Sequence, residues 1–233
     1  RWYADSTFAE LVRIFGLQPV KKPHLVVLNN LAQYNQASGG TPPLLPESEG
    51  FSSLHGGYFA DQTFDFSATP PQYQGAGVSF WDRKDAALKG WGPTWVRWAA
   101  AQSFADAVDP SWFYVGDSIA SAAGGAVRPD AAAFWGEKKI PRWLRYGAAS
   151  YVERYMKNPE AAAGADPWDL RAFALAELKK SGGLRKLEEV FAFAIYVAKL
   201  DDSTRLYDEA GLVVAFLLDG AYGNKKLRAQ HEA

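Results

Sequence analysis

Residues Gly90–Asp109 read GWGPTWVRWAAAQSFADAVD, and this stretch decides the fold that we expect for the chain. Pro93 suits the first turn of an α-helix, and Thr94 can help to satisfy the free N–H groups there. Asp109-Pro110 ends the helix, because the residue before a proline is pushed out of the α region. Side chains at steps of three and four residues share one face of this helix, namely Trp95, Trp98, Ala99, Gln102, Ala105, Asp106 and Asp109. The stretch therefore predicts a core helix that is anchored by two tryptophans.

The composition is that of a globular protein and excludes several function classes. Of 233 residues, 48% are hydrophobic and 22% are charged, and the formal net charge is −1. General binders of nucleic acids or of anionic membranes need a surplus of Lys and Arg, so neither class fits. Cysteine is absent, which excludes disulfides, thiolate metal sites and cysteine nucleophiles. Aromatic residues make up 15% of the chain, which indicates a well-filled core or a groove lined with stacking platforms.

The ends of the sequence indicate a piece of a longer protein. The sequence begins at Arg1 without an initiator methionine, and it stops at Ala233 within a helical pattern. No apolar run approaches the roughly 20 residues of a membrane span, so we expect no membrane-spanning segment here.

Residues 1–90 favour a strand-rich N-terminal part. A short helix is predicted over Ser6–Phe15, with Gly16 as its stop. The later elements of this part are a buried strand over Pro23–Asn30, a helical turn over Leu31–Ala37, hairpin strands at 57–59 and 63–66, a strand over Gly77–Trp81, and loops at 38–53 and 68–74.

Residues 91–233 favour helices. Besides the opening stretch, helices are predicted over Pro129–Trp135, Arg142–Lys157, Pro167–Lys180, Leu184–Ala198 and Asp201–Asp219, and another from Asn224 onward. The expected fold class is α+β: a small N-terminal mixed sheet, residues 1–90, packed on a predominantly helical body, residues 91–233. We expect the two parts to form one domain.

Three stretches resemble the gluzincin-type, peptidase MA-like zinc metallopeptidases, in the order expected for that family. They are Trp95–Phe104 (WVRWAAAQSF), Pro141–Glu153 (PRWLRYGAASYVE) and Tyr207–Gly220 (YDEAGLVVAFLLDG). In the family, the first stretch carries H-E-x-x-H and the second supplies a glutamate as third zinc ligand. The resemblance implies a zincin-like fold and extends over most of the chain, from Lys22 to Ala233.

The zinc-binding residues of that family are absent here. The five positions of H-E-x-x-H fall on residues 97–101 or on residues 98–102, and neither register holds a ligand or a general base. Tyr146 stands where the third ligand is expected. The histidines of the chain, His24, His55 and His231, lack ligand spacing. We therefore expect no catalytic residue, no metal and no cofactor.

The resemblance implies a catalytically inactive, peptidase-like domain that acts as a binding or structural module. Arg97, Trp98, Gln102 and Tyr146 would lie near the floor of a vestigial cleft, which is either filled by these side chains or retained as a ligand site. Tyr58 would lie along an edge strand that holds an extended peptide.

The partner is expected to be a protein or extended peptide, not a nucleic acid. Because related proteins are commonly exported, we expect the cell envelope or secretion. The alternative function is a hydrolase of another class, acting on glycans, on a reused scaffold. No nucleophile elbow, phosphate loop or dinucleotide motif supports another assignment.

Overall fold

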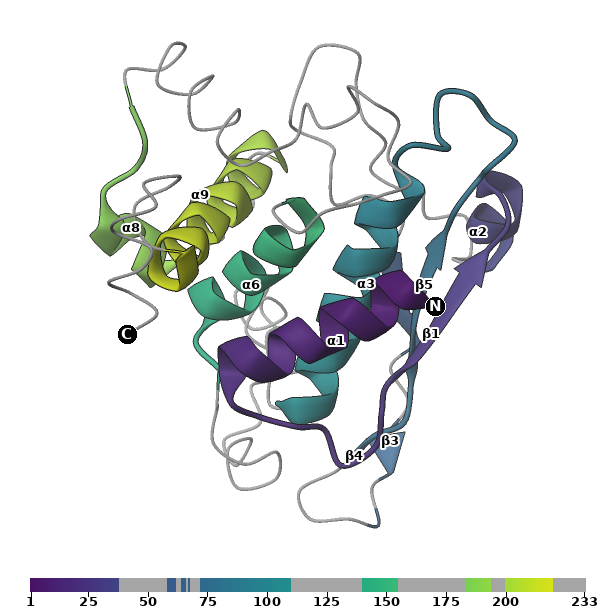
Figure 1. Cartoon of the computed structure of the whole chain (residues 1–233), viewed down its shortest axis with the longest axis horizontal. Helices are drawn as coiled ribbons and strands as arrows, with labels where there is room; N and C mark the ends of the chain where they lie inside the picture. Colours follow the sequence, from purple (N-terminus) through teal and green to yellow (C-terminus); the bar gives the residue numbers. More distant parts are fainter. Residues whose placement is uncertain are drawn as a thin grey trace, which may run out of the picture.

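The computed structural model describes residues 1–37, 58–61, 64–65, 67, 72–109, 140–154, 183–193 and 200–219. Within these ranges the fold is α+β and mostly helical, with its strands in the first part of the chain (Figure 1). The helices are α1 (Trp2–Phe15), α2 (Leu31–Ala37), α3 (Gly92–Val108), α6 (Arg142–Arg154), α8 (Leu187–Ala192) and α9 (Leu200–Asp219). The strands are β1 (His24–Leu28), β2 (Tyr58–Asp61), β3 (Phe64–Asp65), β4 (Gln72–Tyr73) and β5 (Ala76–Phe80).

The larger sheet has the order β1-β5-β2, with β5 in the middle. Strand β1 runs parallel to β5 and β2 runs antiparallel to it, so that Val78 pairs with both Val26 and Phe59. The strand predicted at Pro23–Asn30 forms as β1, but it is not buried as predicted. Strand β1 lies at the edge of the sheet, where Val26 and Val27 are 43% and 40% exposed, since β5 is the only described strand that lies beside it.

The predicted hairpin between residues 57–59 and 63–66 does not form. Strand β2 pairs with β5 over four residue pairs, whereas β3 pairs with β4 in a separate two-stranded sheet. The β2–β5 ladder is the longer one and buries the apolar middle of β5, which explains why β2 prefers it. Strand β4 lies within residues 68–74, where the sequence predicts a loop.

Helix α3 confirms the helix predicted from the opening stretch. It is enclosed by neighbours on all sides: every residue from Gly92 to Val108 is buried except Ala107. This burial agrees with the predicted core helix. Gly77 allows β5 to approach this helix closely, because a Cβ at Gly77 would lie 2.0 Å from Ser103 Oγ and 2.9 Å from Ala99 O. The Thr94 hydroxyl donates to the Trp91 carbonyl at 2.7 Å, so this bond in the first turn goes to a carbonyl and not to a free N–H group.

Helix α1 lies across α3 and begins earlier than predicted (Figure 1). Its start is Trp2, not Ser6, because the Ser6 hydroxyl donates back to the Tyr3 carbonyl at 3.1 Å within the helix. Gly16 ends the helix with φ 63°, as the sequence predicts.

Of the two C-terminal helices, α8 differs from its prediction and α9 confirms it. Helix α8 is shorter than the predicted Leu184–Ala198, because Phe193 takes a left-handed conformation with φ 42° directly after it. Helix α9 confirms the prediction over Asp201–Asp219. The helices predicted over Pro129–Trp135 and Pro167–Lys180 and from Asn224, and the loop at 38–53, lie outside the described residues.

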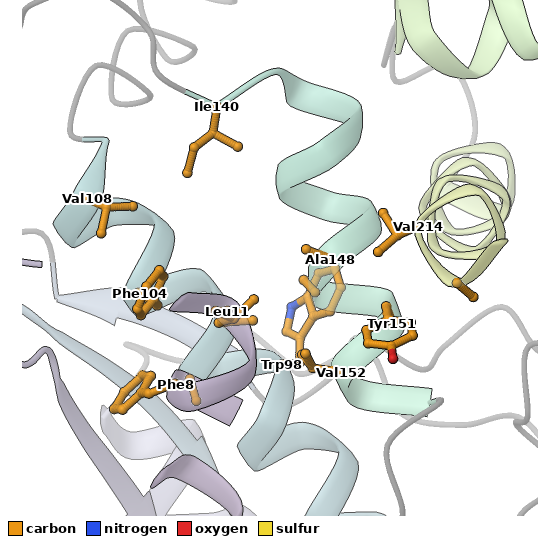
Figure 2. Packing of buried hydrophobic residues seen from close by; sticks show 14 residues of the cluster. Phe8, Leu11, Trp98, Phe104, Val108, Ile140, Ala148, Tyr151, Val152 and Val214 are labelled. Atoms are coloured by element: carbon orange, nitrogen blue, oxygen red, sulfur yellow. The ribbon is translucent and has the colours of Figure 1, made fainter. Parts of the chain in front are cut away.

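The main core is formed by α1, α3, α6 and α9 (Figure 2). Phe8 and Leu11 of α1 meet Phe104 of α3, and Trp98 of α3 lies beside Ala148 of α6. Helices α6 and α9 touch at Gly147, where a Cβ would lie 2.6 Å from the carbonyl oxygen of Ala210.

The division into residues 1–90 and 91–233 stays a prediction, although α1 from the first part shares this core with the second. None of the helices that the structure describes combines the length and the apolar character needed to cross a membrane.

Candidate functional site

The expected cleft floor is a packed aromatic cluster between α3, α6, α8 and α9. Trp98 stacks against Tyr146 with ring centroids 6.4 Å apart and an interplanar angle of 26°. Tyr207 lies 4.9 Å from Tyr146 and 5.7 Å from Trp98, and Phe193 lies 5.3 Å from Tyr146 in a nearly parallel plane. Burial raises the pKa of Tyr207 well above its ordinary value. We call these four residues the aromatic cluster.

A buried polar network lies next to the aromatic cluster and links α3 to α6. Arg145 donates through Nη2 to Asp106 Oδ1 at 2.5 Å and to Gln102 Oε1 at 3.1 Å. The guanidinium also lies 5.6 Å from the Tyr146 ring centroid. All three polar side chains are less than a tenth exposed, so their mutual hydrogen bonds offset part of the cost of removing them from water. Gln102 is therefore held by an arginine.

The structure separates Arg97 from the other predicted cleft residues. Its side chain, fully buried, lies between α3 and α1, where Nη1 donates to Ser6 Oγ at 3.1 Å and to Thr7 Oγ1 at 3.0 Å. The guanidinium lies 5.4 Å from the Trp2 ring and 5.1 Å from the Tyr3 ring. Burial lowers the pKa of Arg97 to about 10, so the group stays protonated at neutral pH. Arg97 therefore links α3 to α1, whereas Trp98 and Tyr146 link α3 to α6.

Tyr58 lies at the start of β2, at the edge of the three-stranded sheet opposite β1. Its backbone pairs with Ser79 of β5. The prediction that Tyr58 lies on an edge strand agrees with this placement within the described sheet, and the side chain is outside the described part.

Several buried polar residues of α6 and α9 were missed by the sequence analysis. Ser150 donates to Asp208 at 3.2 Å, and Glu209 accepts from the Arg185 guanidinium at 2.6 Å. Glu153 is fully buried. In the stretch Tyr207–Gly220, Asp208 and Glu209 stand directly before an apolar run. This pattern is the sequence signal from which the burial of the two carboxylates could have been predicted.

The side chains at the predicted zinc positions do not fit zinc. A catalytic zinc needs three nitrogen, sulfur or oxygen ligands around an open position. Trp98 and Tyr146 stack on each other here, and Gln102 Oε1 accepts hydrogen bonds from Arg145. In the described ranges, no three His, Cys, Asp or Glu side chains lie close enough together to hold a metal ion. The arrangement packs α3, α6 and α9 together and links α3 to α6 through hydrogen bonds.

Comparison with protein-family models, with curated protein sequences and with solved structures finds no match for this chain. The resemblance to the gluzincin-type peptidases thus stays a prediction from the three sequence stretches.

Proposed function

We propose that this domain is a catalytically inactive, peptidase-like module that works by binding or as a structural element. One observation supports the proposal most directly: the positions at which the resemblance expects zinc ligands hold the stacked pair Trp98 and Tyr146. Their rings pack against Tyr207 and Phe193, and Arg145 engages the neighbouring Gln102.

The energetics of this packing account for Trp98 and Tyr146 at the expected zinc positions by stability alone, with no need for a catalytic role. Burying a large apolar side chain stabilises a fold by about 1.5–3 kcal/mol, and offset aromatic pairs add about 0.5–1.5 kcal/mol each. Of the two alternatives for the old cleft, a filled cavity and a retained ligand site, the close ring contacts around Tyr146 favour filling.

The sheet edge at β2 is the best-supported place for a protein partner of the proposed module. An edge strand offers backbone N–H and C=O groups that an extended peptide can pair with. Strand β2 has β5 on one side, and no further described strand pairs with its other side. An extended peptide is therefore the partner class that we propose.

The alternative function, a hydrolase acting on glycans, has less support. Glycoside hydrolysis needs two carboxylates that flank a substrate in a cleft. Two carboxylates of α9, those of Asp208 and Glu209, are buried, and they bond to Ser150 and Arg185. This pattern is typical of carboxylates that hold helices together.

Two measurements test the proposal on the purified chain. Mass spectrometry of metal content, after dialysis against zinc, is expected to show far less than one zinc per chain. A quenched-fluorescent peptide library is expected to show no cleavage. Stoichiometric zinc or peptide turnover would overturn the inactive assignment.

A binding assay tests the peptide partner separately. A library of extended peptides is screened by fluorescence polarisation, with backbone N-methylated copies of each hit as matched controls. Binding that N-methylation abolishes supports strand addition at β2. Equal binding of the methylated copies contradicts it, because they cannot donate the ladder hydrogen bonds.

A further inference from the structure

A polar hollow of about 730 Å³ lies where β1 and β5 end. Asn29 and Asn30 line it from the connection between β1 and α2, Gln33 lines it from the start of α2, and residues 81–85 line it from the loop after β5. Because β1 and β5 are parallel, their carboxyl ends meet at one edge of the sheet, which is the common location of ligand sites in sheets of this kind. The volume is within the range of small-molecule pockets.

The wall after β1 offers hydrogen-bond donors. Asn30 Oδ1 accepts from the Gln33 backbone N–H at 2.9 Å, and Gln33 Oε1 accepts from the Asn29 backbone N–H at 3.0 Å. These bonds occupy a carboxamide oxygen of each side chain and fix both side chains at the start of α2. Their carboxamide N–H groups are the atoms that a bound molecule can use.

The wall after β5 is held rigidly around Trp81. The Trp81 backbone N–H donates to the Leu28 carbonyl at 2.9 Å, and the indole Nε1–H donates to the Lys89 carbonyl at 2.8 Å. One side of the ring lies against Gly92, where a Cβ would come within 2.1 Å of the indole. The Arg83 guanidinium lies 4.2 Å from the ring centroid. The Arg83 guanidinium is therefore positioned over the Trp81 ring by a cation–π contact.

The carboxylates of this wall shape the loop and supply acceptors. Asp82 Oδ1 accepts from the backbone N–H groups of Lys84 and Asp85 at 3.1 and 3.0 Å. Asp85 Oδ1 accepts from the Ala87 backbone N–H at 2.8 Å. In each carboxylate these bonds engage Oδ1, which leaves Oδ2 as an acceptor for a ligand.

The formal charges of the lining residues cancel, since Arg83 and Lys84 balance Asp82 and Asp85. A hollow with balanced charge does not concentrate anions or cations. It does combine amide and guanidinium donors with carboxylate acceptors at close spacing. A hydroxyl group both donates and accepts, so neighbouring hydroxyls on a ring match such a wall. We propose that this hollow binds a neutral saccharide of one or two rings.

Saturation-transfer NMR and isothermal calorimetry on the full chain test this site. The probes are maltose, cellobiose and N,N′-diacetylchitobiose, with citrate and inorganic phosphate as anionic probes. At least one saccharide is expected to bind, and the anions are not. Absence of saccharide binding, or binding of the anions alone, would overturn the proposal.

Two pairs of variants locate the binding. Asn29→Ala and Lys84→Ala each remove a polar group from the hollow and are expected to weaken saccharide binding about threefold to tenfold. Gln36→Ala and Lys89→Ala remove similar exposed side chains outside the lining and are expected to leave binding unchanged. Equal affinity in all four variants would place the saccharide elsewhere and refute the assignment. The result is independent of the inactive-peptidase proposal, which concerns other residues, those of the aromatic cluster, and is tested by metal content and peptide cleavage.

Discussion

Arg145 on α6 donates to Asp106 on α3 across 2.5 Å, and both side chains are less than a tenth exposed. The same distance separates Arg13 from Glu10 on the surface of α1, where the arginine side chain is 53% exposed. The two pairs share this N–O distance and differ in burial, and the exposed pair lies within one helix whereas the buried pair joins two. They therefore allow a comparison of buried and exposed charge.

Replacing Arg145 by Met should lower the free energy of unfolding by about 3–5 kcal/mol, because a buried carboxylate loses its cation. Arg13→Met should change it by less than about 1 kcal/mol. Urea denaturation of both variants measures the difference. The double variant Arg145→Met/Asp106→Leu should recover part of the loss. Equal effects of the two arginine substitutions would show that the buried network contributes no more than a surface pair.

Gly147→Ala should destabilise the contact between α6 and α9. A Cβ at Gly147 would lie 2.6 Å from the Ala210 carbonyl oxygen and 3.0 Å from Val214 Cγ2. Although alanine favours helix more than glycine does, the clash should dominate and lower stability by about 1–3 kcal/mol.

Thermal and urea unfolding report the effect of Gly147→Ala. The double variant Gly147→Ala/Val214→Ala serves as control and should not recover the loss, because the nearest obstacle is backbone. Full recovery would show that the side chain of Val214, and not the α9 backbone, sets the helix spacing.

Trp98→Ala should leave a cavity within the aromatic cluster. Large-to-small changes at buried aromatic residues cost about 3–5 kcal/mol, and Trp98 is 4% exposed. Trp2→Ala is the matched control, since Trp2 is 55% exposed and its removal should cost about 1 kcal/mol. Added indole should stabilise the Trp98→Ala protein more than the Trp2→Ala protein, as differential scanning fluorimetry can show. An unchanged melting temperature on Trp98→Ala would contradict the packed arrangement.

Tyr34 should make stability fall in alkali. Burial raises the pKa of Tyr34 from its ordinary value of 10.0 to about 12, so the folded state holds the phenol proton more tightly than the unfolded chain. The resulting stabilisation is complete below pH 10 and is lost as the pH rises towards 12, by up to about 1.4 kcal/mol per pH unit. Between pH 10 and 12, the free energy of unfolding measured in urea should fall less steeply with pH for Tyr34→Phe than for the unchanged protein. The difference between the two proteins at pH 8 serves as the reference. Parallel curves for both proteins would refute the assignment.

The elements that local sequence signals specify were predictable. Helix α3 follows from Pro93 at its start and from Asp109-Pro110 at its end, and the end of α1 follows from Gly16. Strand β5 lies within one residue of the predicted Gly77–Trp81. For the two helices, a proline or a glycine with an unusual backbone conformation marks the boundary.

The features that depend on distant partners were not predictable. Sequence alone does not show that β2 pairs with β5, because the choice of strand partner depends on residues far apart in the chain. The apolar run in β1 suggests burial, yet its position at the edge of the sheet exposes Val26 and Val27.

The candidate site was predictable only in part. The structure brings Trp98 and Tyr146 into contact, as the resemblance implies, and adds Tyr207 and Phe193. Arg97 precedes Trp98 directly in sequence, yet one helical step of about 100° turns it towards α1. The partner of Gln102 is Arg145, 43 residues further along the chain, and no local pattern reveals such a pair.

The enclosure of α3 on all its faces has a kinetic consequence. Its amide protons reach solvent when the surrounding helices and sheet separate, and not through fraying at an outer face. Deuterium exchange along this helix should therefore be uniformly slow, and its rate should report the opening of the whole fold. The amides of α2, a short helix with an exposed side, should exchange through smaller local openings.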